Sequence, residues 1–491
     1  MKNIYKLIGA FMIVSLFGCN DAIDIEQPGR LGAENAFTSV ADLQAGLLGA
    51  YNFLDTTNEI GFTAAFTDES TRGRDNGGQN VNIQNFNLNS GNGYVSNIWL
   101  SYYGAIGTAN RIIAAAGSVD SSEDQTAYDN ILGQTYAIRA YSFFQILTYF
   151  STDYRDDSAL AGILVTAPAT DIFADVPRST NGDFYAQIES DLNAAAGLIT
   201  SNTNQTFMGQ DFLTALRARM AAYRGQYTVA DGHAASLLAS YPIANQAQYV
   251  NMFNDSDFTE IIFSLERNRN DSFDGQGLTG GGWAGSLFAF IDSSAGGGPY
   301  MEMSRAVFNI LDGTSDVRLT TAFNAGDSTV DTGYDGNNNY LNDDVLLVQK
   351  YPGSDGQPLM NDLKVFRSAE MLLIRAEAAA SASNFTAAAT FIKQLRDARL
   401  GTAQPIPSYA NQTEAFGAIL DERRLELLYE GHRWVDLKRL GDMGGRAIDR
   451  DAWECSFLAG CTLSNSDFRF TLPIPLSEVT ANAAVQQNPG Y

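Results

Sequence analysis

The pattern of apolar and polar residues along this 491-residue chain is mainly that of helices. Apolar residues recur three and four positions apart in stretches several turns long, which is the spacing of one face of an α-helix. Helices are therefore predicted over 39–54, 99–113, 136–150, 180–196, 212–227, 366–380 and 385–400, with a helical hairpin at 419–440. A short apolar run, Glu260–Leu265, predicts a strand. We therefore expect a mostly α protein.

Small residues predict that these helices pack in pairs. In 212–227, for example, alanines lie among the larger apolar residues and allow a neighbouring helix to approach closely. This composition is typical of tetratricopeptide-like helical hairpins, although no clean repeat of roughly 34 residues is present. No long linker, low-complexity block or charge run divides the chain. Residues 19–491 are therefore expected to form a single domain, a scaffold of hairpins with long irregular loops and a few short strands.

Two long polar stretches interrupt the helical pattern. Residues 61–97 are rich in glycine and asparagine, and residues 271–299 are rich in glycine. Loops of this length in a compact protein usually have a function, because an ordinary connection needs only a few residues. We therefore expect ligand contacts in these two loops.

The beginning of the chain has the pattern of a lipoprotein signal peptide. An apolar run over 7–17 follows two lysines and is too short to span a membrane. The run ends at Gly18 and Cys19, which is the order of a small residue and a cysteine at a lipoprotein cleavage site. We predict that residues 1–18 are removed and that Cys19 carries the lipid.

Two other cysteines, Cys455 and Cys461, are six positions apart. In an oxidising compartment such an even pair is expected to form a small surface disulfide, and the alternative is two unpaired thiols. Two sulfurs without a nearby histidine or a second cysteine pair cannot complete a tetrahedral zinc site. We therefore expect no metal at this position.

The charge of the chain restricts its partners. The formal net charge is −25 at pH 7, so the protein as a whole repels phosphate backbones and is not expected to bind nucleic acid. Hydrophobic residues make up 45% of the sequence, which is enough for a large core and excludes a disordered acidic protein.

The sequence has little catalytic chemistry. His233 and His432 are the only histidines, and no metalloprotease, serine hydrolase or nucleotide-binding motif is present. The segment 331–344 has several residues of a calcium loop, but Tyr340 replaces the glycine and Leu346 the glutamate that such a loop requires. We expect no cofactor, no metal site and no enzyme activity.

The stretch 419–440, ILDERRLELLYEGHRWVDLKRL, has the densest pattern of charges. Arg423, Glu426 and Glu430 lie three, four and seven positions apart, so they share one face of a helix. Gly431 is expected to end that helix, because glycine enters the left-handed conformation without steric cost. The simplest interpretation is a helical hairpin held by an internal ion-pair cluster, with a structural role.

The same stretch resembles the C-terminal signature of the SusD/RagB family of outer-membrane nutrient-binding lipoproteins. The matching residues are Glu422, Arg423, Arg424, Glu426, Gly431, His432, Arg433, Trp434, Asp436, Leu437 and Arg439. Segments at 136–150, 366–380 and 385–400, and the end of the chain, also resemble the family. The resemblance therefore covers nearly the whole sequence.

The resemblance implies a SusD-like fold and a lipid-anchored position on the cell surface, in the outer membrane. It also implies capture of an oligosaccharide or polysaccharide and its delivery to a SusC-like TonB-dependent transporter. Capture of peptides, which some members of the family perform, is the alternative within the family. A surface glycan hydrolase, which needs only two carboxylates in a cleft, and a purely structural tetratricopeptide adaptor are alternatives from other classes.

The first long loop supplies most of the candidate ligand contacts. Asp68, Arg72 and Arg74 carry groups that bind hydroxyls, and Tyr94 carries a ring on which a sugar can stack. In chain order this loop matches the region where family members place ligand contacts. These four residues are therefore predicted to bind the ligand.

The second long loop adds Trp283 and Tyr300 to the predicted site. The alternative for Trp283 is a loop anchor that packs against the scaffold, and Tyr300 adjoins the apolar start of the next helix. Trp99 is not included, because its helical spacing with Tyr103 and Ile106 indicates a core residue.

Overall fold

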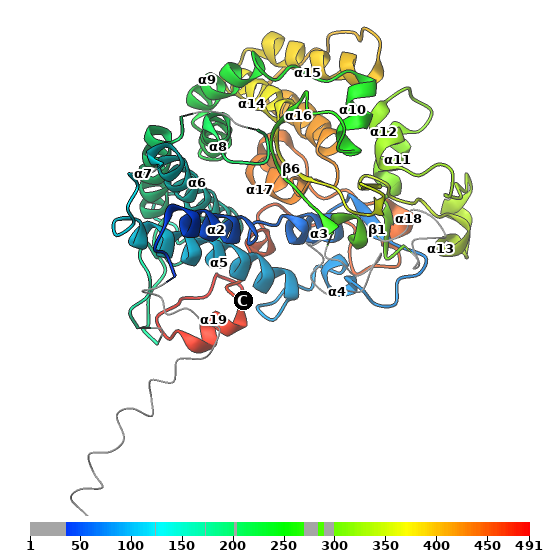
Figure 1. Ribbon diagram of the computed structural model, residues 1–491. Helices are drawn as coiled ribbons and strands as arrows, with labels where there is room; N and C mark the ends of the chain where they lie inside the picture. The colour runs from blue at the N-terminus through cyan, green and yellow to red at the C-terminus, as the bar shows by residue number, and fades with distance from the viewer. Residues whose placement is uncertain (1–35, 123, 172, 201–203, 270–282, 289–298) are drawn as a thin grey trace, which may run out of the picture.

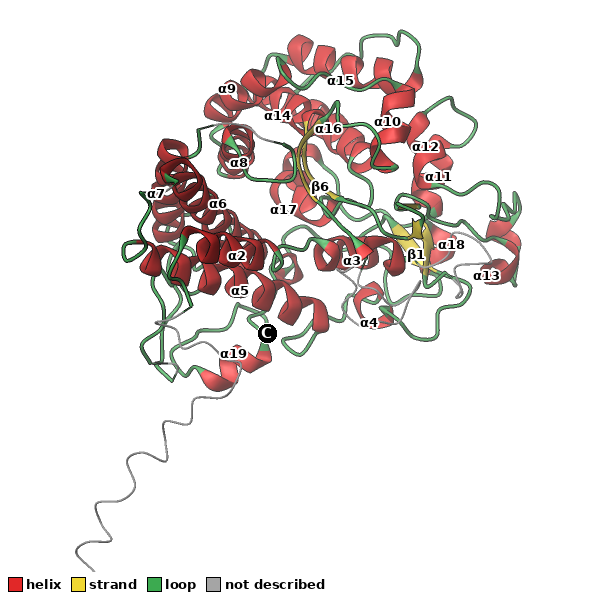
Figure 2. Cartoon of the chain, in the orientation of Figure 1, coloured by secondary structure: helices red, strands yellow, loops and turns green. Residues whose placement is uncertain are grey.

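The computed structural model describes residues 36–122, 124–171, 173–200, 204–269, 283–288 and 299–491, and these residues are mostly helical (Figure 1, Figure 2). The predicted mostly α fold is therefore confirmed. The proposed signal peptide, Cys19 and most of the second long loop lie outside the described residues.

Long helices form the scaffold, and neighbours in the chain pack against each other, α5 on α6, α6 on α7, α8 on α9, α14 on α15 and α16 on α17. They are α2 (Val40–Tyr51), α5 (Gly93–Ala116), α6 (Gln125–Phe150), α7 (Asn181–Leu198), α8 (Gln210–Tyr223), α9 (Tyr227–Leu238), α14 (Ser368–Ser381), α15 (Phe385–Leu400), α16 (Gln412–Glu426) and α17 (Arg433–Gly444). Contacts between α9 and α14 join the pairs into a continuous arc (Figure 1).

Shorter elements connect and flank these long helices (Figure 1). The helices are α3 (Thr57–Phe66), α4 (Val81–Gln84), α10 (Gln246–Phe253), α11 (Arg305–Leu311), α12 (Val317–Ala322), α13 (Tyr340–Asp343), α18 (Ala452–Cys455) and α19 (Leu476–Ala481), with 3-10 turns η4 (Ala284–Leu287), η5 (Tyr334–Gly336) and η6 (Phe468–Phe470). Three antiparallel strand pairs are described: β1 (Ser70–Arg72) with β3 (Met301–Met303), β2 (Ile261–Leu265) with β6 (Leu363–Arg367), and β4 (Gly353–Ser354) with β5 (Gln357–Pro358). The predicted strand at 260–265 is β2.

The prediction of one irregular loop over 61–97 was wrong at both ends. Helix α3 begins at Thr57 and continues to Phe66, and α5 begins at Gly93. Between them, β1 and α4 leave short irregular segments only. The helix predicted over 212–227 is α8, which ends at Tyr223. Gly225 has φ +71° and reverses the chain before α9 begins at Tyr227.

The helical hairpin at 419–440 is present, but its first helix ends before Gly431. Helix α16 ends at Glu426, and Tyr429 and Gly431 both have positive φ, +61° and +83°. Residues 427–430 therefore form a turn, and α17 begins at Arg433.

The charges of the hairpin pair mainly with other elements, which differs from the predicted internal cluster. Glu426 is 0% exposed and accepts hydrogen bonds from Arg367 (3.0 Å) at the end of β6 and from Arg399 (2.9 Å) on α15. Arg423 bonds Asp436 on α17 at 2.7 Å and Glu377 on α14 at 3.3 Å. The signature therefore joins several helices and a strand through buried ion pairs.

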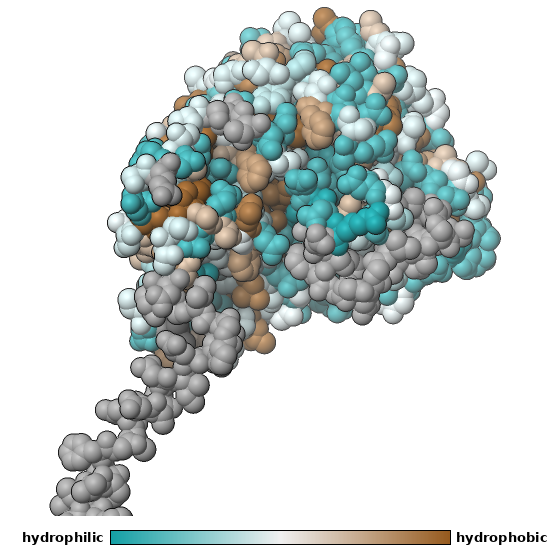
Figure 3. Space-filling view, viewed as in Figure 1, coloured by the Kyte–Doolittle hydropathy of each residue, from teal (hydrophilic) through white to brown (hydrophobic). Residues whose placement is uncertain are grey.

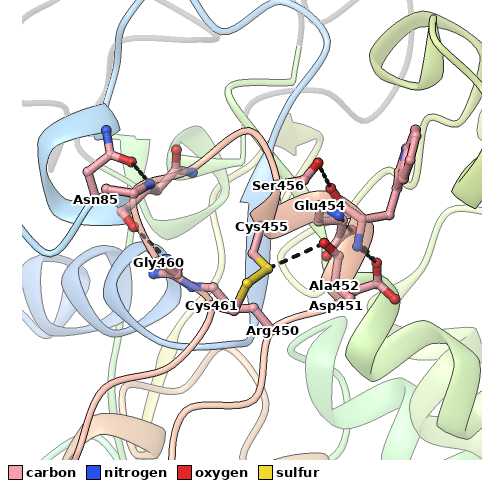
Figure 4. Close-up of a disulfide and its surroundings, with 12 residues drawn as sticks. Asn85, Arg450, Asp451, Ala452, Glu454, Cys455, Ser456, Gly460 and Cys461 are labelled. Atoms are coloured by element: carbon pink, nitrogen blue, oxygen red, sulfur yellow. Dashed lines mark hydrogen bonds between the residues drawn. A yellow bond between two sulfur atoms is a disulfide. The ribbon is translucent and has the colours of Figure 1, made fainter.

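A disulfide between Cys455 and Cys461 closes the loop after α18 (Figure 4). The Arg450 backbone N–H donates to the Cys461 carbonyl at 3.3 Å, and its guanidinium donates to the Gly460 carbonyl at 3.1 Å. The Ala459 backbone N–H donates to Asn85 at 2.9 Å, next to α4. The disulfide therefore fixes a loop that packs against an early part of the chain.

None of the helices in the described part of the chain is both long enough and apolar enough to cross a bilayer.

Candidate functional site

Helix α3 connects the two surfaces on which candidate ligand contacts gather. Nine of its ten residues are buried. In Figure 1, α2, α3 and β1 follow one another from left to right across the front of the molecule. At 1.5 Å per residue, α3 separates its two ends by about 15 Å. A ligand of several sugar rings has the length needed to reach from one end to the other.

The first surface, which we call the arginine loop, consists of residues 72–80 with Tyr300. Strand β1 pairs with β3, so that Arg72 lies opposite Met301. The Tyr300 carbonyl accepts hydrogen bonds from the Gly73 N–H (3.0 Å) and the Asn76 side chain (2.8 Å). The structure therefore brings together the two stretches that the sequence placed far apart.

Only glycine fits at position 73. A Cβ atom there would lie 2.1 Å from the Pro299 carbonyl oxygen, which is far shorter than any normal contact. The close approach of the two backbones therefore depends on Gly73, and it sets where the neighbouring arginines lie.

Two arginines of this loop keep unused donors. Arg72 is half-buried, and its Nε has no hydrogen-bond partner among the described residues. The Arg74 side chain is 39% exposed, and its nearest acidic neighbour, Asp75, is 3.6 Å away. The Arg74 backbone N–H donates to Glu302 at 2.6 Å, which fixes the backbone while leaving the guanidinium accessible.

Tyr94 and Tyr300 are both half-buried at the edge of this loop. The Tyr94 hydroxyl donates to the Asn80 side chain at 3.0 Å. Burial raises the pKa of Tyr94 to about 12, so the phenol is neutral at physiological pH. Its ring contacts Phe62 of α3 edge-on, with 6.2 Å between centroids. Tyr94 is therefore held in place by the scaffold, and only part of its ring is exposed to solvent.

Two predicted site residues are buried and do not fit a role in ligand contact. Asp68 is 0% exposed, and its carboxylate accepts from Arg433 through two bonds of 2.9 Å. Trp283 is 3% exposed and lies directly before η4. This burial agrees with the alternative interpretation, in which Trp283 anchors its loop against the scaffold. Neither side chain reaches the surface, because each is enclosed by packing that the sequence did not reveal.

The second surface, which we call the α2 cavity, was missed by the sequence analysis. It has a volume of about 200 Å³ and is formed by the end of α2 and two distant loops. Its lining residues are Leu48, Tyr51, Asn52, Thr206, Phe207, Leu265, Glu266, Arg267 and Asn268. Figure 3 shows this face hollowed beside α2, with apolar surface on the α2 and α5 side and hydrophilic surface opposite.

Tyr51 and Phe207 form the aromatic wall of the α2 cavity. Their rings meet edge to face with 5.4 Å between centroids. The Tyr51 hydroxyl donates to Gln134 and accepts from the Met208 N–H, both at 2.8 Å. The Tyr51 ring is therefore fixed before any ligand arrives, which lowers the entropy cost of binding.

Polar groups line the same cavity. Arg267 bonds Asp55 at 3.2 Å and the Leu54 carbonyl at 3.2 Å, which ties the loop after β2 to the start of α3. Glu266 on the same loop is exposed. An apolar ring surface in one cavity with fixed polar groups is the arrangement that binds sugars, because a sugar has apolar ring faces and polar hydroxyls.

Among the described residues, no group of three or more histidine, cysteine or acidic side chains is arranged to hold a metal ion.

Comparisons with known proteins identify the family. A model described as the SusD family matches residues 226–491, which is more than half of the chain, and a model described as "Starch-binding associating with outer membrane" matches residues 26–223. SusD-like protein P2 of Formosa agariphila is 25% identical, and the alignment covers 99% of each chain.

Solved structures share the fold. A SusD superfamily protein from Bacteroides thetaiotaomicron superposes with a TM-score of 0.77 at 23% identity, over 92% of this chain and 100% of that one. A putative sugar binding protein from Bacteroides vulgatus gives a TM-score of 0.74 at 21% identity, over 93% and 99%. The chain belongs to the SusD family of non-catalytic binding proteins.

Proposed function

We propose that this protein captures an oligosaccharide at the outer-membrane surface, along the face that runs from the α2 cavity to the arginine loop. The observation that carries the proposal is the aromatic wall of the α2 cavity, Tyr51 and Phe207, in one cavity with fixed polar groups. The description of the matching N-terminal family model, which names starch binding and the outer membrane, supports the same class of ligand.

Each end of this face has a distinct role in the proposal. Sugar rings stack in the α2 cavity, and the unused donors of Arg72 and Arg74 bind hydroxyls at the other end of α3. Tyr94 and Tyr300 border the same end. A ligand of a single sugar engages one end only, so affinity is expected to rise with chain length until both ends are occupied.

Phe207→Ala and Arg74→Ala should each weaken oligosaccharide binding by about tenfold, because one removes a stacking ring and the other a charged donor. The ligand is first selected on an oligosaccharide array screened beside a peptide library, and its Kd is then measured by calorimetry. Phe173→Ala and Arg111→Ala make the same changes at exposed positions outside both surfaces and serve as controls.

If both variants fold and bind the oligosaccharide with wild-type affinity, this face is not the binding surface. Selection of peptides instead of oligosaccharides would favour the peptide-capturing alternative within the family.

The proposal includes a lipid anchor and delivery to a transporter. Cys19→Ala should release the protein from the outer membrane, because the lipid is expected on that cysteine. Cell fractionation and lipid labelling measure this, with Cys455→Ser as a control that changes a different cysteine. A Cys19→Ala protein that stays membrane-bound and labelled would contradict the anchor. Delivery to a SusC-like TonB-dependent transporter is tested by co-purification from native membranes.

A further inference from the structure

A second hollow, which we call the arginine recess, lies apart from the α2 cavity and is built from other elements. It has a volume of about 510 Å³, within the size range of ligand sites. Arg424 of α16 and Arg433 of α17 line it, together with Asp449 of the loop after α17, Ile310 of α11 and Thr462. The neighbouring disulfide holds part of this wall, since Thr462 directly follows Cys461.

Both arginines are buried, and each leaves a nitrogen unused. Arg433 is 3% exposed and donates through Nε and Nη2 to the Asp68 carboxylate. Its Nη1 has no hydrogen-bond partner in the described structure. Arg424 is 7% exposed and donates through Nη2 to the Asp68 backbone carbonyl at 2.9 Å, while its Nε likewise has none. A buried charged donor without an acceptor lowers the stability of the fold, so we expect a bound ligand to supply the missing acceptor.

The local charge is incompletely balanced. Asp68 is the buried carboxylate that serves both arginines, at 2.9 Å from Arg433 and 3.5 Å from Arg424. Arg450 lies near the same carboxylate. Within the described structure its guanidinium donates to backbone carbonyls only, at Thr67, Ala65, Phe66, Gln84 and Gly460. Burial raises the pKa of Glu69 to about 8, so this neighbour is mostly uncharged at pH 7.

The charged residues at the rim of the recess do not neutralise the positive charge of the buried arginines. Arg446 and Asp421 pair with each other through bonds of 2.8 and 2.7 Å and so cancel. Asp449 is exposed, and its charge is screened by solvent. Arg424, Arg433 and Arg450 therefore share Asp68. Asp436, another buried carboxylate that acts on Arg433, already accepts from Arg423 and Arg439.

We propose that the arginine recess binds an oxyanion, either a small free anion or the carboxylate, phosphate or sulfate group of a larger molecule. The oxygens of the anion accept from the unused nitrogens of Arg424 and Arg433, and planar guanidinium groups match this geometry. This site does not depend on the proposed oligosaccharide face, since the two share no lining residue.

The test uses inorganic sulfate, inorganic phosphate and acetate as probes. Calorimetry and thermal unfolding of the full protein are recorded with each probe against sodium chloride of equal ionic strength. Ile310→Asp places a carboxylate at the mouth of the recess and should weaken binding of the anion by at least tenfold. Ile310 is 50% exposed, so the variant should fold.

Ile406→Asp is the matched control, because Ile406 is 58% exposed and outside the recess. It should bind the anion as the wild type does. Arg424→Gln removes one of the unused donors and should also lose binding, if it folds. Equal anion binding by wild type and Ile310→Asp would overturn the proposal. So would the absence of any effect beyond that of ionic strength, or binding of a neutral sugar in place of the anion.

Discussion

Glu426→Gln is expected to lower the free energy of unfolding by about 3–5 kcal/mol, the cost of breaking a buried ion-pair network. Oε1 of Glu426 accepts from Arg367 and Arg399, Oε2 accepts from Arg399, and Arg318 lies 3.7 Å away. A glutamine removes the negative charge and turns an amide toward guanidinium groups. Those groups then remain buried with too few acceptors.

Urea unfolding at pH 7 measures this loss. Asp421→Asn is the control on the same helix, because Asp421 forms a pair with Arg446 in which both side chains are more than 40% exposed. Such a surface pair contributes about 0–1 kcal/mol. Oligosaccharide affinity per folded molecule should be the same in both variants. If Glu426→Gln kept its stability and lost binding, the signature would belong to the site and not to the scaffold.

The elements that were predicted well from the sequence are helices with a clear spacing of apolar residues and an N-terminal capping residue. Helix α2 begins after Ser39, whose side chain accepts from Asp42 in a capping box, and α7 begins after Thr180 in the same way. Helix α3 was missed because nine of its ten residues are buried. A helix enclosed on all sides has no polar face and therefore no amphipathic period.

The candidate site was harder to predict, because exposure depends on partners that are distant in sequence. Asp68 pairs with Arg433, 365 positions further along the chain. The α2 cavity is assembled from three separate segments, represented by Tyr51, Phe207 and Arg267. No local pattern marks Phe207 as a cavity wall. By contrast, Arg72, Arg74 and Tyr300 were named from the composition of the two long loops and, for the first loop, from its position in the family resemblance, and β1–β3 pairing brings them together.

A second large effect is expected from Glu69→Gln, and it depends on pH. Glu69 is 0% exposed, and both carboxylate oxygens lack a hydrogen-bond partner within the described residues. Burial, and then the negative charge of Asp68, raise its pKa from 4.5 to about 8, although Arg433 and Arg424 oppose the shift. The folded protein therefore keeps this proton over a range in which the unfolded chain has lost it.

The sign of the effect follows from that difference in bound protons. The wild-type protein has the full contribution of protonated Glu69 below pH 4.5 and loses it as the pH rises to about 8, a change of about 5 kcal/mol. Glutamine cannot ionise. Glu69→Gln should therefore match the wild type near pH 4.5 and become progressively more stable than it toward pH 8.

Unfolding in urea at pH 3.5, 5, 6.5 and 8 measures this difference, and Glu426→Gln provides a contrast of opposite sign between the two lowest pH values. Arg399 and Arg367 hold the pKa of Glu426 well below its usual value, against the effect of burial. That carboxylate stabilises the fold above pH 4.5, and its contribution is lost on acidification. The stability deficit of Glu426→Gln should therefore be constant from pH 8 to pH 5 and shrink at pH 3.5, while the stability gain of Glu69→Gln grows from pH 5 to pH 8. A pH-independent difference between Glu69→Gln and wild type would mean that Glu69 is ionised in the folded protein.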